Sequence, residues 1–319
     1  MIRGDIRRNV AARIAFALIA AASSCVGAEP PARAPVDPAS VVQTFNIDGT
    51  RLQLDLHDDF GVGTAPLVEW IERSFHIVAD YYGRFPMARL NIQIVATDGR
   101  GVRGGTTWGS PALIRVRVGR DVTAHELHDD WVLVHEMIHL ALPEVGRAHA
   151  WLAEGISTYV EGIARAQAGN RTETDVWSEH VHSMSRGLPQ TGDQGLDRTH
   201  TWGRTYWGGA LFCLLADVEI RSRTGNKFGL QDALRAVAKS SGGLATEWTM
   251  NQVMSTGDAA VGTDTLQKLY DEMKDAPITP DLAALWKNLG VESRDATISL
   301  RNDAPLATVR EAIMRRPQR

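Results

Sequence analysis

Two of the ten histidines in the sequence, His135 and His139, lie four residues apart with Glu136 between them. An α-helix advances by about 100° per residue, so both imidazoles would lie on one helix face and reach a single cation. Glu136 would lie on the flank of that face, near the open coordination position of the metal but not bound to it. This H-E-x-x-H spacing is typical of a catalytic zinc site with its general base. The plainer interpretation is a helix with two surface histidines and a solvated glutamate.

A catalytic zinc ion usually has three protein ligands and one open position, so the chain should supply a third donor. Glu154 is the candidate, because the fourteen residues 140–153 that separate it from His139 allow a loop and a turn. A second helix would then lie antiparallel beside the first, and Gly155 would remove bulk beside the ligand. The residues after His139 lack the glycine and third histidine of a metzincin. We therefore predict one Zn²⁺ per chain, held by His135, His139 and Glu154.

The H-E-x-x-H motif is followed by Trp151-Leu152-Ala153-Glu154-Gly155, and a Tyr-then-Gly-Gly segment follows over residues 204–211. Together these motifs resemble the gluzincin branch of zinc peptidases, and they are similar to the peptidase MA-like and glycyl-aminopeptidase-like (M61) families. Residues 281–291 are similar to the last domain of M61-like proteins. The resemblance covers residues 40–315, with its specific parts at 135–161 and 204–221. It implies a zinc metallopeptidase that acts on a peptide or protein substrate.

In such an enzyme Glu136 would take a proton from the metal-bound water and pass it to the leaving amine. Tyr206 is the candidate donor to the oxyanion, by resemblance and because it opens a helix after a flexible stretch; a half-buried aromatic with no catalytic role stays open. Glu161 lies two turns after Glu154 and would accept the second N–H of a metal-bound histidine, unless it is a solvated surface residue. Exposed positions are the expectation for the remaining polar candidates: His125, His128, His149 and Arg204.

Periodicity along the chain predicts an α+β fold: a zincin-like catalytic domain with a small mixed sheet and active-site helices, then a mainly helical C-terminal part. The expected strands are the two of a hairpin over 41–60, a third over 90–95 and a fourth over 112–118. The strand 112–118 would lie at a sheet edge, where a peptide can add by main-chain hydrogen bonds. Residues 99–109 read as a glycine-rich loop and 169–203 as a polar stretch. The expected helices cover 66–83, 131–142 (capped by Asp129 or Asp130), 150–168, 205–223, 229–240, 246–255, 263–274, 280–289 and 305–315. We predict subdomains at 41–128 (α/β), 129–225 (catalytic) and 226–319 (helical).

The composition bounds the function and the location. The chain is 44% hydrophobic and 23% charged with a net charge of −4, and it has no basic block, which excludes nucleic-acid binding. Residues 1–28 read as a signal peptide, with four arginines before a short apolar run. Alternatively, residues 1–24 are a lipoprotein signal and Cys25 carries a lipid, the one expected membrane contact. Residues 29–40 are a flexible linker, and Cys213 reads as a buried, inert thiol. These features predict an exported bacterial protein, periplasmic or lipid-anchored.

A second hypothesis is an exported zincin-fold protein that binds or scaffolds without turnover. The intact Glu136 favours the peptidase, because a protein without turnover has no need of the base. The sequence leaves the substrate, the oligomeric state, and the choice between aminopeptidase and endopeptidase action open. The segment Gly104-Gly105-Thr106-Thr107 resembles only loosely the one that binds the substrate amino terminus in aminopeptidases.

Overall fold

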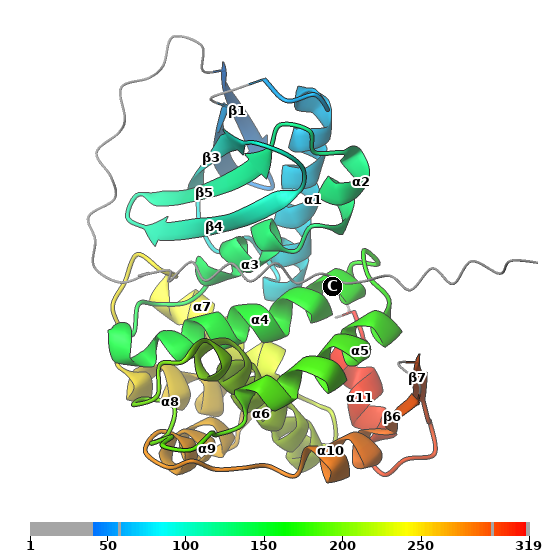
Figure 1. The fold of residues 1–319 in the computed structure, drawn as a ribbon. Helices are drawn as coiled ribbons and strands as arrows, with labels where there is room; N and C mark the ends of the chain where they lie inside the picture. Colours follow the sequence, from blue (N-terminus) through cyan, green and yellow to red (C-terminus); the bar gives the residue numbers. More distant parts are fainter. Residues whose placement is uncertain (1–40, 57–58, 295–296, 317–319) are drawn as a thin grey trace, which may run out of the picture.

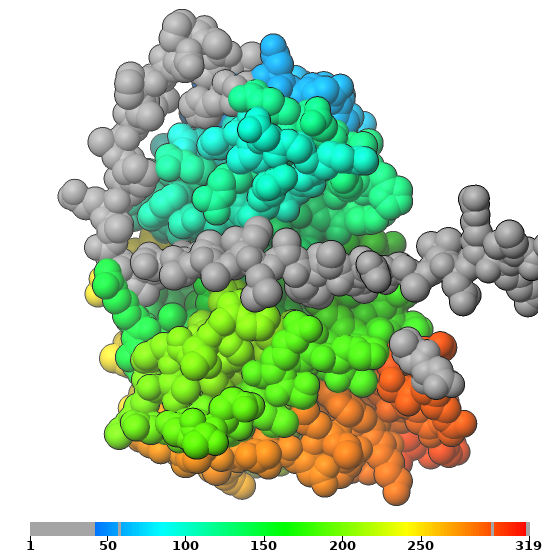
Figure 2. Space-filling view, viewed as in Figure 1, coloured from blue at the N-terminus to red at the C-terminus, as the bar shows by residue number. Residues whose placement is uncertain are grey.

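The computed structural model describes residues 41–56, 59–294 and 297–316. The predicted signal peptide, lipid-carrying Cys25 and linker fall in residues 1–40 and lie outside these residues. A β-sheet part and a helical part lie one above the other (Figure 1). The space-filling view shows the same division, with the sheet part in cyan above and the helices in green to orange below (Figure 2). The predicted α+β fold class is confirmed.

Five strands form a mixed sheet in the order β1-β2-β3-β5-β4. The pairs β1–β2 and β4–β5 are antiparallel, and β2–β3 and β3–β5 are parallel. Alternating leucines and isoleucines of β2 and β3 are buried, as a sheet with one covered face requires. The strands are β1 (Val41–Ile47), β2 (Thr50–Leu56), β3 (Arg89–Thr97), β4 (Val102–Gly109) and β5 (Ala112–Gly119).

Two expectations about the sheet are wrong. The predicted loop at 99–109 contains strand β4, and β5 lies inside the sheet between β3 and β4, so β4 is the edge strand. The pairing comes from main-chain hydrogen bonds to β5, with a register shift between Val102 and Gly105. Glycine and threonine in β4 give no apolar alternation, so the sequence carried no strand signal there.

The helical part follows the predicted order. Helix α1 packs behind the sheet and α3 lies below β4, while α4 packs against both α3 and α6 (Figure 1). Each predicted helix corresponds to a helix of the structure, with ends that differ by a few residues. The predicted helix 131–142, for example, is the shorter α3. The helices are α1 (Thr64–Tyr82), α2 (Ala124–Asp129), α3 (Val132–His139), α4 (Ala150–Gln167), α5 (Glu173–Ser183), α6 (Gly209–Thr224), α7 (Leu230–Ser241), α8 (Met250–Val261), α9 (Thr265–Met273), α10 (Leu282–Leu289) and α11 (Ala307–Met314).

Other elements were missed. The polar stretch 169–203 contains α5, and the C-terminal part contains a small hairpin, β6 (Val291–Arg294) and β7 (Thr297–Leu300). Short turns of 3₁₀-helix, η1 (Arg147–His149) and η2 (Met184–Gly187), and a π-helical turn, η3 (Arg204–Gly208), connect the longer helices. The buried apolar side chains form one continuous core from the sheet to the last helix. Within the described residues, no helix has the length and apolar character needed to cross a membrane.

Candidate metal centre

Helix α3 carries the H-E-x-x-H motif and is buried along its whole length. Its start is fixed by Asp130, whose carboxylate oxygens accept the backbone N–H groups of Val132 and Leu133, each at 3.1 Å. The indole N–H of Trp70 on α1 donates to the same carboxylate at 3.0 Å. Of the two predicted caps the structure uses Asp130, which satisfies amides that a helix start leaves unpaired and ties the motif to α1.

Helix α4 brings the third donor to the histidines. Glu154 Oε2 lies 3.2 Å from His135 Nε2 and 3.5 Å from His139 Nε2. One ligand atom from each of the three buried residues lies within 4.8 Å of the others. The two imidazole rings meet edge to face with their centroids 4.9 Å apart. The sequence-predicted ligand set therefore converges on one point, from two neighbouring helices.

This donor set fits a zinc ion. Two donors bound at about 2.0–2.2 Å to one tetrahedral zinc lie roughly 3.3–3.5 Å apart, which matches the spacing of the Glu154 oxygen from the two imidazole nitrogens. Two imidazoles and one carboxylate are also the ligand types of catalytic zinc sites that keep a fourth position open.

The three groups influence each other's protonation. Burial disfavours the charged form of Glu154, yet the charge of His139 and the hydrogen bonds from both imidazoles hold its pKa far below the ordinary value. Burial also disfavours protonated His139, but the Glu154 carboxylate outweighs it and raises the pKa of that imidazole. Without a metal, the site therefore favours an ionised carboxylate beside a positively charged imidazole.

Glu136 lies outside this group of converging donors, as expected for a base rather than a ligand. It is buried, and its Oε2 accepts a hydrogen bond from the Thr107 hydroxyl at 2.6 Å. Thr107 belongs to strand β4, so the edge of the sheet contacts the base directly. Thr107 belongs to the segment 104–107 with its loose resemblance to a substrate-binding one, but no spacing pattern links it to a helix residue 29 positions away.

Tyr206 also lies close to the metal centre. Its ring stacks on that of His135 with centroids 6.3 Å apart and an interplanar angle of 19°. The ring of the exposed Trp202 also stacks on Tyr206, with centroids 5.8 Å apart. Tyr206 is half-buried and belongs to the π-helical turn η3, a rare conformation that often occurs at functional sites. The structure thus brings the ring of Tyr206 beside His135, and its role as an oxyanion donor stays a prediction.

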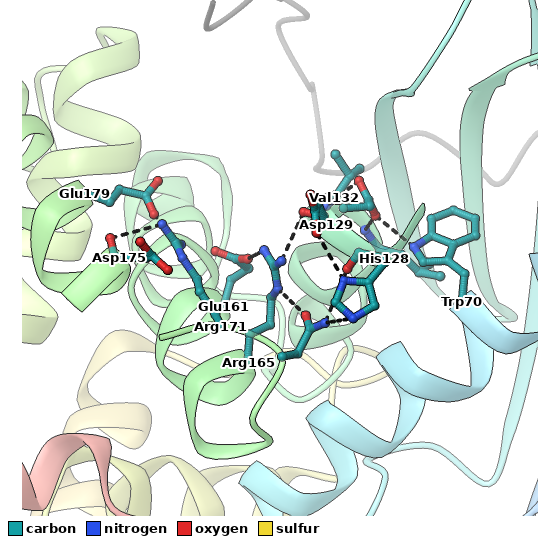
Figure 3. Close-up of polar contacts among 12 residues, drawn as sticks. Trp70, His128, Asp129, Val132, Glu161, Arg165, Arg171, Asp175 and Glu179 are labelled. Atoms are coloured by element: carbon teal, nitrogen blue, oxygen red, sulfur yellow. Dashed lines mark hydrogen bonds and ion pairs between the residues drawn. The ribbon is translucent and has the colours of Figure 1, made fainter. Parts of the chain in front are cut away.

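The structure places Glu161 elsewhere. Its Oε1 accepts a hydrogen bond from Arg165 Nη1 at 2.8 Å, and Arg165 Nη2 in turn donates to the carbonyl of Asp129 at 3.0 Å (Figure 3). Meanwhile His135 Nδ1 is buried without a hydrogen-bond partner among the described residues. The expected support of a histidine by Glu161 therefore has no counterpart in this geometry, because an arginine one turn along α4 takes the carboxylate.

Two further expectations are wrong. Arg204 is buried, forms an ion pair with the buried Asp193 at 2.8 Å, and donates to the carbonyl of Gly187 at 2.6 Å. His149 is only half-exposed, because its Nδ1 lies 2.9 Å from Asp197, a residue that the sequence analysis did not single out. His125 and His128 are exposed, as predicted, and Cys213 is buried.

The mixed sheet and the helices below it form an α+β fold that solved structures share. An aminopeptidase N family protein from Idiomarina loihiensis matches with a TM-score of 0.61 and 16% identity, over 79% of this chain and 49% of that one. An M1 zinc metallopeptidase from Deinococcus radiodurans matches with a TM-score of 0.52 and 14% identity, over 76% and 53%. A variant of an M1 zinc metallopeptidase from the same organism, bound to a Tyr-Ser-Ala substrate, matches equally well.

This chain thus spans about half the length of the solved structures that it matches. At such identities the likeness shows that the chain shares the fold of M1 zinc metallopeptidases. The resemblance to the M61 family stays a prediction. A scan of protein-family models and a search of curated proteins each find no match.

Proposed function

We propose that this chain is a zinc-dependent peptidase of the gluzincin type. The observation that carries the proposal is the convergence of His135, His139 and Glu154 beside a buried Glu136 that is not one of the ligands. A structural zinc site would close all four positions with protein ligands, whereas three donors and a neighbouring carboxylate suit hydrolysis.

Each side chain has a separate task in this proposal. Zn²⁺, when bound by His135, His139 and Glu154, supplies a water of lowered pKa and polarises the scissile carbonyl. Glu136 accepts the proton of that water and delivers it to the leaving amine. Tyr206 donates a hydrogen bond to the oxyanion that develops on the carbonyl. An extended substrate would lie along the outer edge of β4, which pairs with no further strand among the described residues.

Replacing the base tests this proposal. Glu136→Gln keeps the size of the side chain and removes its ability to take a proton, so peptide hydrolysis should fall by at least about 100-fold. Zinc content, measured by elemental analysis, should stay near one ion per chain in both proteins. Wild-type protein that holds zinc but cleaves nothing in a broad peptide library would instead support a binding or scaffold role.

We also propose that the protein is exported, on the basis of residues 1–28. Cell fractionation, with and without Cys25→Ala, separates a soluble periplasmic form from a lipid-anchored one. Recovery of the full-length chain in the cytoplasm would contradict both.

A further inference from the structure

Strand β4 contacts the proposed general base, Glu136, directly. Thr107 Oγ1 lies 2.6 Å from Glu136 Oε2 and 3.1 Å from the backbone carbonyl of the same residue. Both side chains are buried, with 6% and 8% of their surfaces exposed. A short hydrogen bond to a carboxylate that is shielded from water is stronger than one at the surface.

Gly105 faces the same carboxylate, since alternate residues of a strand lie on one face. A Cβ at this position would lie 2.6 Å from Glu136 Cγ and 2.9 Å from Cδ and Oε1. These separations are far below van der Waals contact, so any side chain at position 105 would displace the base. On one face of β4, Thr107 thus donates a hydrogen bond to the Glu136 carboxylate, and Gly105 leaves space for it.

These two contacts restrict Glu136 from one side. A glutamate has three rotatable bonds, and a base that must meet one water molecule gains from a single orientation. The Thr107 hydroxyl holds Oε2, so the carboxylate is fixed against the strand. The backbone of Gly105 allows Oε1 to lie against the strand.

We propose that Thr107 is a positioning residue for the general base and that Gly105 is its steric counterpart, an inference that rests on the proposed peptidase function. Thr107 acts through its contact with Glu136 rather than on the reacting atoms. It fixes the orientation in which the Glu136 carboxylate meets the water, so its loss affects turnover rather than binding.

The kinetic test compares Thr107→Val with Thr107→Ser. Valine keeps the shape and removes the donor, so kcat should fall by about 10- to 100-fold while KM and zinc per chain stay unchanged. Serine keeps the donor and should restore kcat to within about threefold of wild type. The matched control is Thr50→Val on β2, away from the proposed substrate edge; its buried hydroxyl donates to the carbonyl of Met87 at 3.0 Å, so its loss should leave kcat at the wild-type value.

A structural test decides the inference without any turnover. In crystal structures of the metal-free proteins, Glu136 Oε2 should lie within hydrogen-bond distance of the hydroxyl in wild type and Thr107→Ser. In Thr107→Val and Gly105→Ala the carboxylate should adopt another rotamer, while His135 and His139 keep their positions.

The inference is overturned by a Glu136 carboxylate in the same place in all four proteins, or by a Thr107→Val enzyme with wild-type kcat. A serine variant as slow as valine would do the same. If wild-type protein cleaves no peptide, the proposed function fails, and the crystallographic comparison still decides whether Thr107 orients Glu136.

Discussion

Helix α4 buries two glutamates, Glu154 and Glu161, and each needs a positive partner. A carboxylate removed from water is costly unless a cation or several hydrogen bonds compensate for the lost hydration. Glu161 has Arg165 beside it. The ion-pair neighbours of Glu154 among the described residues are His135 and His139, both able to bind a metal. The same helix therefore carries one structural carboxylate and one that is suited to a divalent ion.

The proposed oxyanion role of Tyr206 depends on its hydroxyl group. Removing its hydroxyl in Tyr206→Phe leaves the ring that stacks on His135, so folding and zinc content should not change. If the hydroxyl donates to the oxyanion, kcat should fall by about 10- to 1,000-fold with less than a threefold change in KM. Steady-state kinetics on one peptide measures both.

Tyr159→Phe is the matched control for this experiment. Tyr159 is buried on α4 and donates to Asp217 at 3.0 Å, so loss of its hydroxyl should lower stability and leave kcat unchanged. A Tyr206→Phe enzyme with wild-type kcat would show that the tyrosine serves only to pack against the histidine.

The ligands could be predicted from the sequence because their geometry is local. His135, Glu136 and His139 share one helix, and one short connection leads to Glu154, so helical spacing alone brings them together. The contacts of Thr107 and Gly105 with Glu136 could not be predicted, since they depend on the pairing of β4 with β5. The partners Asp193 and Asp197 lie in a polar segment without periodicity, where nothing in the sequence distinguishes a buried carboxylate from a solvated one. Arg204 was assigned to the surface for the same reason.

At the scale of elements, the contact between α4 and α6 fixes where Glu154 lies. A Cβ on Gly155 would lie 2.3 Å from the Gly209 Cα, and a Cβ on Gly209 would lie 2.1 Å from the carbonyl oxygen of Trp151. The two helix backbones thus touch directly beside the third ligand. The sequence predicts that Gly155 leaves space beside the metal ligand. In the structure the backbone of α6 fills that space.

Gly155→Ala should therefore separate the two helices. We expect the free energy of unfolding to fall by about 1–3 kcal/mol, as in other overpacked cores, because the clash is with backbone that cannot move aside alone. Zinc content should fall as well, since Glu154 is the adjacent residue. Urea denaturation and elemental analysis measure the two effects.

Gly162→Ala on the same helix is the control. There the nearest atoms to the new Cβ are Arg171 Nη1 at 3.2 Å and Val176 Cγ1 at 3.4 Å, both on side chains. The better helix propensity of alanine offsets this milder crowding, so the unfolding free energy should change by less than about 1 kcal/mol. Equal destabilisation by the two substitutions would show that the α4–α6 contact has no special role.

At the scale of the whole molecule, the metal centre lies where the sheet part meets the helical part. β4 contacts α3 from the sheet side, and α4 contacts α3 from the helical side, with η3 packed against α4. Because the buried apolar side chains form one core, a disturbance at this junction affects the stability of the whole chain. The predicted subdomain boundaries at 128/129 and 225/226 stay predictions.

Asp130 makes this junction sensitive to pH. Burial raises the pKa of its carboxyl to about 6, against the hydrogen bonds from Leu133, Val132 and Trp70 and the positive charge of Arg165. Arg73 on α1 also faces this carboxylate. In the unfolded chain the carboxyl titrates near its ordinary pKa of about 3.9, so the folded state binds the proton more tightly.

The sign of the effect on stability follows from this difference. Between about pH 4 and pH 6 the folded protein carries more protons than the unfolded chain, so the free energy of unfolding falls as the pH rises through this window. The stabilisation is complete below the unfolded pKa and is lost above the folded one. We expect a loss on the order of 1–2 kcal/mol, since each unit of pKa shift is worth about 1.4 kcal/mol and partial solvent access reduces it.

Asp130→Asn removes this ionisation and isolates its contribution. Urea denaturation measures the free energy of unfolding of wild type and Asp130→Asn at pH 4 to 7, both in a chelator. The titration of the other groups cancels in the difference between the two free energies. The asparagine protein should be less stable at every pH, because its amide cannot accept all three donors. The gap should be widest near pH 4 and should narrow by the expected 1–2 kcal/mol toward pH 6. A gap that stays constant with pH would show that Asp130 keeps its ordinary pKa and caps α3 as a plain carboxylate.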